Sequence, residues 1–335
     1  MTPSPGKRTR LERVCNKEGV IAALALDQRS ALRALLAKAK GLAAEAIPAR
    51  MLEEFKEGVS RILTPHASAI LLDPEYGLPA ARQRAKTAGL LLAYERTGYD
   101  RAVAGRLPRL LDEWSGRRLV EVGADCVKVL LYYSPFSANA INDVKHAWVE
   151  RVGAECEALD VPFFLELVVY HDEMDEKSLE FARIKPEAVV GSLTEFSKPQ
   201  YGVDIFKVGF AVSMAFVGAG SGDFAYTREE AKSHLRRAAS AAQKPFIYLS
   251  EGVSNKTFAE ALELAAEAGV RYSGVLCGRA TWKDGVEIYA KGGIGALEEW
   301  LKNVGVENIR RVNEQLRAAT SWRDVYSKAA TESAR

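Results

Sequence analysis

The sequence predicts a single (β/α)8 TIM barrel, an α/β fold, on the evidence of three observations. Short apolar runs alternate with amphipathic segments along the chain, eight such runs can be counted, and no linker interrupts the alternation. Continuous apolar runs of this length are typical of parallel strands buried on both faces. Eight repeats without a linker favour a closed barrel over an open doubly wound sheet, which is the alternative because periodicity alone does not show closure.

The expected strands follow in order along the chain. They cover residues 19–26, 67–72, 89–94, 124–132, 161–169, 203–208, 245–249 and 273–277. Residues 1–18 are expected to form a flexible N-terminal tail, residues 19–325 the barrel, and residues 326–335 a C-terminal tail.

Helical patterns fill the intervals between these runs. Apolar residues recur at helical spacing within 51–63 and 144–156. Thr227 and Glu230 have the spacing of a capping box, and Ser254 is expected to cap the helix that follows the seventh strand.

The composition lacks the signatures of nucleic-acid-binding and membrane-spanning proteins. The 335 residues carry a formal net charge of +2, without the basic excess of nucleic-acid-binding domains. No apolar run approaches the roughly 18 residues that a membrane helix needs. The N-terminus has no apolar core of a secretory signal, and the four cysteines form no C-x-x-C pair. We therefore expect a cytoplasmic protein without disulfides and, as for many barrel enzymes, a homo-oligomer.

Ionisable residues interrupt or directly follow several of the apolar runs. In a barrel, catalytic groups come from the C-terminal ends of the strands, so these residues are candidates for the site. They are Asp27, Asp73, Lys128, Glu166, Lys207 and Arg279.

Lys128, Glu166 and Lys207 are the most informative of this set. Each stands between apolar neighbours, on the expected fourth, fifth and sixth strands. A buried charge is costly unless it is paired, so we expect the three side chains to face one cavity. A lysine attacks a ketone only as the free amine, and a carboxylate between two lysines can act as general acid and base. A salt-bridge network that only holds the barrel together is the alternative.

The loops after the seventh and eighth strands carry a second set of candidates. In this fold they commonly hold phosphate groups through backbone N–H groups and a helix N-terminus. The residues concerned are Ser250, Gly252, Gly278 and Arg279, of which the arginine can pair bidentately with a phosphate. Ordinary turn glycines with a surface arginine are the alternative.

Metal and nucleotide signatures are weak. None of the four histidines forms an H-x-H or H-E-x-x-H pattern, so neither a metal site nor another cofactor is expected. The glycine-rich stretch 218–223 does not directly follow a strand and lacks the full G-x-G-x-x-G pattern, so we interpret it as a loop.

Six segments of the chain carry a family resemblance. In order they are A-L-A-L-D-Q-R-S, L-L-D-P-E-Y-G-L-P-A, G-L-L-L-A-Y-E-R-T-G-Y-D, P-F-F-L-E-L, Y-L-S-E-G-V-S and G-V-L-C-G-R-A-T-W. With these motifs the chain resembles the class I tagatose 1,6-bisphosphate aldolases over residues 19–322. The resemblance implies a barrel, no metal, and a Schiff-base mechanism that cleaves tagatose 1,6-bisphosphate and its epimers to dihydroxyacetone phosphate and glyceraldehyde 3-phosphate.

The resemblance also implies roles for single residues. Lys207 matches the Schiff-base lysine and Glu166 the proton-transfer carboxylate, while Asp27 and Lys128 match polar residues that line the reacting carbons. The matched substrate and phosphate contacts are Gln28, Arg29, Ser250, Gly278 and Arg279.

The chain departs from the family pattern at Gly209. The family usually has K-V-E after the strand-six lysine, whereas this chain has Lys207-Val208-Gly209. A carboxylate is therefore missing from the strand face that carries the lysine. Its loss is expected to favour the free amine and to enlarge the pocket.

Three other functions are compatible with these residues. A sulfofructose phosphate aldolase, or another Schiff-base aldolase, would use the same lysine on a different substrate. A catalytically silent sugar-phosphate sensor would bind its ligand without cleaving it. A phosphate-binding barrel isomerase would convert its ligand without breaking a carbon–carbon bond.

Overall fold

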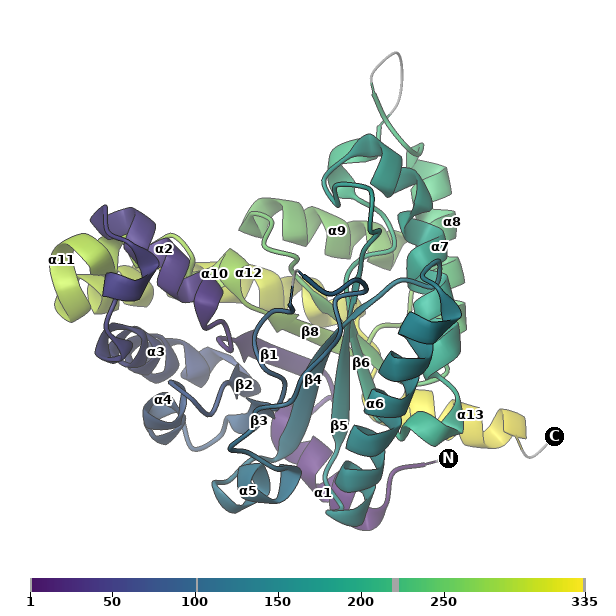
Figure 1. Ribbon diagram of the computed structural model, residues 1–335, viewed down its shortest axis with the longest axis horizontal. Helices are drawn as coiled ribbons and strands as arrows, with labels where there is room; N and C mark the ends of the chain where they lie inside the picture. The colour runs from purple at the N-terminus through teal and green to yellow at the C-terminus, as the bar shows by residue number, and fades with distance from the viewer. Residues whose placement is uncertain (1, 101, 219–222, 334–335) are drawn as a thin grey trace.

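Eight parallel strands close into a barrel in the order β1 to β8, with β8 paired to β1 (Figure 1). The computed structural model describes residues 2–100, 102–218 and 223–333, so most of the glycine-rich stretch 218–223 lies outside the described residues. The strands are β1 (Ile21–Ala25), β2 (Ala69–Leu72), β3 (Gly89–Ala93), β4 (Cys126–Tyr133), β5 (Phe163–Val169), β6 (Ile205–Val208), β7 (Phe246–Leu249) and β8 (Gly274–Cys277). The predicted barrel is confirmed, with each strand inside or within one residue of its predicted range.

Helices surround the barrel and pack on it through a continuous apolar layer (Figure 1). The helices within the described residues are α1 (Pro5–Val14), α2 (Ser30–Lys40), α3 (Ala49–Leu63), α4 (Leu78–Gln83), α5 (Gly116–Glu121), α6 (Asn139–Ala158), α7 (Leu179–Phe196), α8 (Arg228–Ala241), α9 (Asn255–Glu267), α10 (Arg279–Trp282), α11 (Gly285–Trp300), α12 (Val306–Gln315) and α13 (Trp322–Ser333). The predicted capping box of Thr227 and Glu230 and the predicted cap at Ser254 are both present. None of these helices combines the length and apolarity that crossing a membrane requires.

The expected N-terminal tail is wrong for Pro5–Val14, which form a packed helix. Leu11 and Val14 are completely buried against the apolar side chains inside the N-terminal end of the barrel. Lys7 is buried as well, and its Nζ lies 2.9 Å from a carboxylate oxygen of Asp204 at the start of β6. Helix α1 therefore seals the end of the barrel opposite the expected site (Figure 1).

The expected C-terminal tail is also wrong, since α13 runs to Ser333. Trp322 and Tyr326 are buried in the same apolar cluster as α1. The hydroxyl of Tyr326 donates a hydrogen bond to the carbonyl oxygen of Asp204 at 2.7 Å. Both ends of the chain are thus part of the closure of the barrel floor.

The barrel interior changes from apolar to polar along the strands. Side chains on one face of a strand recur every second residue. The layer above the apolar floor is therefore formed by the residue two positions after each floor residue. That position is Lys128 after Cys126 on β4, Glu166 after Phe164 on β5, and Lys207 after Ile205 on β6. Glu166 and Lys207 are also register partners in the β5–β6 ladder.

Candidate active site

A cavity of about 1000 Å³ opens above this polar layer, at the C-terminal end of the barrel. Lys128 and Lys207 lie just beneath it and are 0% and 3% exposed. Gly278 is not one of the residues that line the cavity; it immediately precedes α10. The other predicted site residues line it: Asp27, Gln28, Arg29, Glu166, Ser250, Gly252 and Arg279.

One carboxylate oxygen of Glu166 lies between the two lysines. Its Oε2 is 2.7 Å from Nζ of Lys128 and 2.8 Å from Nζ of Lys207. The three side chains therefore meet as the sequence predicted. A carboxylate in contact with both amines can accept a proton from one reacting group and return it to another.

Lys128 is surrounded by carboxylates. Its Nζ lies 2.9 Å from Asp27 and 2.7 Å from Glu95, in addition to the contact with Glu166. Burial opposes its charge, but the negative charges of Asp27, Glu166 and Glu95 raise the pKa of Lys128 well above its ordinary value. The three carboxylates consequently favour the charged form of Lys128 in the floor of the site.

Asp27 is held in its ionised form by the same contacts. Burial alone would raise its pKa, yet the nearby charges of Lys128 and Lys207 outweigh burial and lower the pKa of Asp27. Its other oxygen accepts a hydrogen bond from the amide of Gln28 at 3.2 Å. Asp27 thus remains an anion and a hydrogen-bond acceptor throughout the neutral range.

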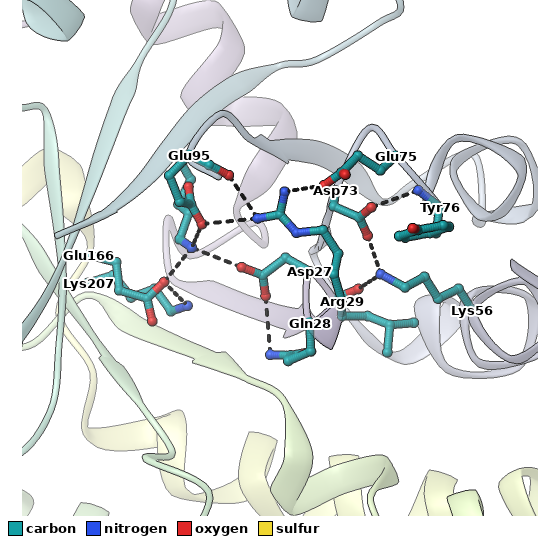
Figure 2. Close-up of polar contacts among 12 residues, drawn as sticks. Asp27, Gln28, Arg29, Lys56, Asp73, Glu75, Tyr76, Glu95, Glu166 and Lys207 are labelled. Atoms are coloured by element: carbon teal, nitrogen blue, oxygen red, sulfur yellow. Dashed lines mark hydrogen bonds and ion pairs between the residues drawn. The ribbon is translucent and has the colours of Figure 1, made fainter. Parts of the chain in front are cut away.

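Glu95 belongs to the site although the sequence analysis did not single it out. It directly follows the apolar run of β3, so the rule that selected the other candidates applies to it as well. Arg29 braces it: one guanidinium nitrogen donates to the backbone carbonyl of Glu95 at 2.8 Å, and another pairs with Glu75 at 2.6 Å (Figure 2). Oε2 of Glu95 is buried and has no hydrogen-bond partner among the described residues.

Asp73 does not reach the cavity. Its carboxylate forms a completely buried ion pair with Lys56 of α3, and Lys56 also donates to the carbonyl oxygen of Leu26 at 2.9 Å (Figure 2). The other oxygen of Asp73 accepts a hydrogen bond from the backbone N–H of Tyr76. Asp73 therefore fixes α3 and the β2 loop to the barrel.

The space beside Gly209 is occupied, contrary to the expectation of a larger pocket that lacks an anion. A Cβ atom at position 209 would stand 2.3 Å from Oε1 of Glu251, whose side chain enters from the loop after β7. Nζ of Lys185 on α7 lies 3.0 and 2.9 Å from the two carboxylate oxygens of Glu251. The absence of a side chain at Gly209 makes room for a carboxylate from the neighbouring loop.

The next residue of this loop supports Arg279. Gly252 has a φ of +77°, and a Cβ there would lie 2.7 Å from the central carbon of the Arg279 guanidinium. The guanidinium thus lies directly over a glycine of the β7 loop. Ser250, two residues earlier, is buried in the same wall of the cavity.

Comparisons with known proteins find relatives that match nearly the whole chain. Residues 21–284 match the family model described as DeoC/LacD family aldolase. The chain is 51% identical over 325 residues to tagatose 1,6-diphosphate aldolase 2 of Enterococcus faecalis, which covers 96% of this chain and 97% of that protein. It is 48% identical over 326 residues to tagatose 1,6-diphosphate aldolase of Staphylococcus aureus, covering 96% and 99%.

A solved structure has the same fold at low sequence identity. It is a fructose-bisphosphate aldolase from Plasmodium falciparum in complex with TRAP and a small-molecule inhibitor. It superposes with a TM-score of 0.67 over 95% of this chain and 96% of that one, at 13% identity. This likeness shows the fold alone.

Proposed function

The chain belongs to the DeoC/LacD aldolase family, and from this premise we propose that it is a class I aldolase that cleaves D-tagatose 1,6-bisphosphate. The products are dihydroxyacetone phosphate and glyceraldehyde 3-phosphate, and epimeric ketohexose 1,6-bisphosphates are also substrates. Lysine chemistry drives the reaction without a metal or another cofactor. The proposal includes the cytoplasmic location and the homo-oligomer expected from the sequence.

The contact of one Glu166 oxygen with two buried lysines carries this proposal. Schiff-base cleavage needs an amine nucleophile, an acid–base group beside it and a cation that stabilises developing oxyanions. Lys207, Glu166 and Lys128 supply these three groups within 2.8 Å contacts at the floor of a 1000 Å³ cavity.

The carboxylate contacts support Lys207 rather than Lys128 as the nucleophile. Only the free amine attacks a ketone, and three carboxylates hold Lys128 in its charged form. Lys207 has one carboxylate contact, with Glu166, among the described residues. Proton transfer from Lys207 to that carboxylate leaves the amine ready to attack.

The proposed steps follow from these positions. The amine of Lys207 attacks the C2 ketone, and the ketone oxygen receives one proton from the attacking nitrogen and one from Glu166. The oxygen then leaves as water, which gives a protonated imine. Glu166 then takes the proton of the C4 hydroxyl while the C3–C4 electron pair moves into the imine. Glyceraldehyde 3-phosphate departs, and Glu166 returns its proton to C3 of the enamine. Water then hydrolyses the imine, which releases dihydroxyacetone phosphate and the Lys207 amine.

The loops after β7 and β8 are proposed to hold the C1 phosphate. Ser250, Gly252 and Arg279 share one wall of the cavity, next to the end of β6 that carries Lys207. The guanidinium of Arg279 has no carboxylate partner among the described residues, so it is available to a phosphate.

Product analysis tests the proposal. Incubation with D-tagatose 1,6-bisphosphate should release both triose phosphates, detected by mass spectrometry, and exchange of one phosphate for a sulfonate should lower kcat/KM. A higher kcat/KM on the sulfonate substrate would instead support a sulfofructose phosphate aldolase.

Two other outcomes would replace the aldolase proposal. A product of the same mass as the substrate would indicate an isomerase. Binding in calorimetry without any product would indicate a catalytically silent sensor.

A further inference from the structure

Arg106 and three tyrosine rings form a cluster on the cavity wall that the proposed chemistry does not use. The central carbon of the guanidinium lies 4.2 Å from the ring centroid of Tyr170, 5.1 Å from that of Tyr99 and 5.7 Å from that of Tyr132. Arg106, Tyr99 and Tyr132 all line the cavity. Three aromatic rings therefore surround a cation that lines the cavity.

Buried hydrogen bonds fix the backbone next to Arg106. Nζ of Lys145 on α6 donates a hydrogen bond to the hydroxyl of Tyr170 at 3.0 Å, and that hydroxyl donates to the carbonyl oxygen of Gly105 at 2.9 Å. Both Lys145 and Tyr170 are completely buried. Arg106 itself has a φ of +49°, a conformation that costs free energy and persists only when the surroundings enforce it. The arginine is thus positioned by buried contacts.

Arg106 pairs with Glu176, and this ion pair is weak enough for an anionic ligand to displace it. One guanidinium nitrogen lies 2.6 Å from Oε1 of Glu176, whose side chain is 40% exposed. Half-exposed pairs of this kind contribute little free energy. A phosphate dianion carries more charge than a carboxylate and matches the fork of a guanidinium bidentately.

The cluster lies across the barrel mouth from Arg279. Arg106 belongs to the segment between β3 and α5, and Tyr132 ends the inward face of β4. In a closed ring of eight strands, β3 and β4 lie opposite β7 and β8. A ketose attached through C2 to Lys207 of β6, with its C1 phosphate beside Arg279, therefore extends its other end toward Arg106.

We propose that Arg106, with the hydroxyls of Tyr99 and Tyr132, forms the subsite for the distal, C6 phosphate of the sugar bisphosphate. This assignment rests on the proposed function. The other arginine expected to contact substrate, Arg29, has its guanidinium taken up by Glu75 and by the backbone of Glu95. The distal subsite would explain how the cavity selects a bisphosphate over a monophosphate.

Calorimetry with non-cleavable ligands tests the subsite without requiring turnover. A hexitol 1,6-bisphosphate and the matching hexitol 1-phosphate are titrated into the wild-type protein and the Arg106→Gln variant. Loss of a charge-assisted pair should weaken binding of the bisphosphate roughly 10- to 100-fold. Binding of the 1-phosphate should change by less than about 2-fold, because it lacks the group that Arg106 contacts.

Two further variants separate this role from a general charge effect. Arg109→Gln removes the same charge from a neighbouring cavity residue that is 60% exposed, and it should change bisphosphate binding by less than about 3-fold. Glu176→Gln frees Arg106 and should tighten bisphosphate binding several-fold without affecting the 1-phosphate.

Equal weakening of both ligands by Arg106→Gln, or no weakening of either, would overturn the subsite. If Arg106→Gln does not fold, unchanged bisphosphate binding in Glu176→Gln would overturn it as well. The proposed function fails separately. If the wild-type protein bound the hexitol bisphosphate through Arg106 but released no triose from the ketose, the subsite would stand and the aldolase would not.

Discussion

At the scale of single residues, the site depends on how three carboxylates share two lysines. Lys128 contacts Asp27, Glu95 and Glu166, whereas Lys207 contacts Glu166 alone among the described residues. In the proposed function, this unequal division gives the two amines different tasks: Lys128 is the fixed cation and Lys207 is the nucleophile. Glu166 contacts both lysines, and an acid–base residue that serves both amines needs these two contacts.

The Glu95→Gln variant tests this division. Burial works against the charge of Lys128, and the charges of Asp27, Glu166 and Glu95 raise its pKa. Removal of the Glu95 charge lowers that pKa, so Lys128 loses its proton at a lower pH. The alkaline limb of the kcat profile should therefore move to lower pH. Glu75→Gln, which alters the far partner of Arg29, is the control, and an unmoved limb in Glu95→Gln would contradict the account.

Gly209 tests the packing around the same layer. In Gly209→Ala the new Cβ would stand 2.3 Å from Oε1 of Glu251, so the β7 loop must shift. The variant should lose about 1–3 kcal/mol of unfolding free energy in denaturant titrations. KM for the bisphosphate should rise, because Gly252 of the same loop supports Arg279.

A double-mutant cycle supplies the control for Gly209. In a Glu251→Ala background, the Cβ added at position 209 has no carboxylate to displace. Gly209→Ala should therefore lower the free energy of unfolding much less than it does in the wild-type protein. Equal costs in the two backgrounds would mean that Glu251 does not occupy the position that the structure gives it.

At the scale of elements, α1 contributes to the barrel rather than trailing from it. Leu11 is completely buried between α1 and the barrel floor. Leu11→Ala should therefore lower the free energy of unfolding by about 2–5 kcal/mol, measured by urea denaturation. Thr9→Ala on the exposed face is the control and should stay within about 0.5 kcal/mol. If Leu11→Ala lowered the free energy of unfolding no more than Thr9→Ala does, residues 5–14 would be a flexible tail, as the sequence predicted.

At the scale of the whole molecule, much of the fold and the centre of the site were predictable from local patterns. Parallel strands buried on both faces leave continuous apolar runs, and eight of them mark a barrel. A lysine or glutamate inside such a run must point into the interior or the helix layer, so Lys128, Glu166 and Lys207 were visible from sequence alone. Glu95 directly follows the run of β3, as Asp27 follows that of β1, and could have been found by its position at the strand end.

The remaining features depend on contacts between segments far apart in the chain. Helix α1 has few apolar residues, and Leu11 and Val14 acquire their burial only from the assembled barrel floor. Lys185 and Glu251 are separated by 66 positions, so no local sequence pattern predicts their ion pair. For the same reason the space beside Gly209 could not be predicted to hold a carboxylate.

The most direct test of the central claim is borohydride trapping of the covalent intermediate, followed by peptide mass mapping. With dihydroxyacetone phosphate or D-tagatose 1,6-bisphosphate present, we predict a reduced adduct on Lys207, an unmodified Lys128, and no adduct in the Lys207→Met variant. An adduct on Lys128, or release of triose phosphates without an adduct on either lysine, would contradict the account.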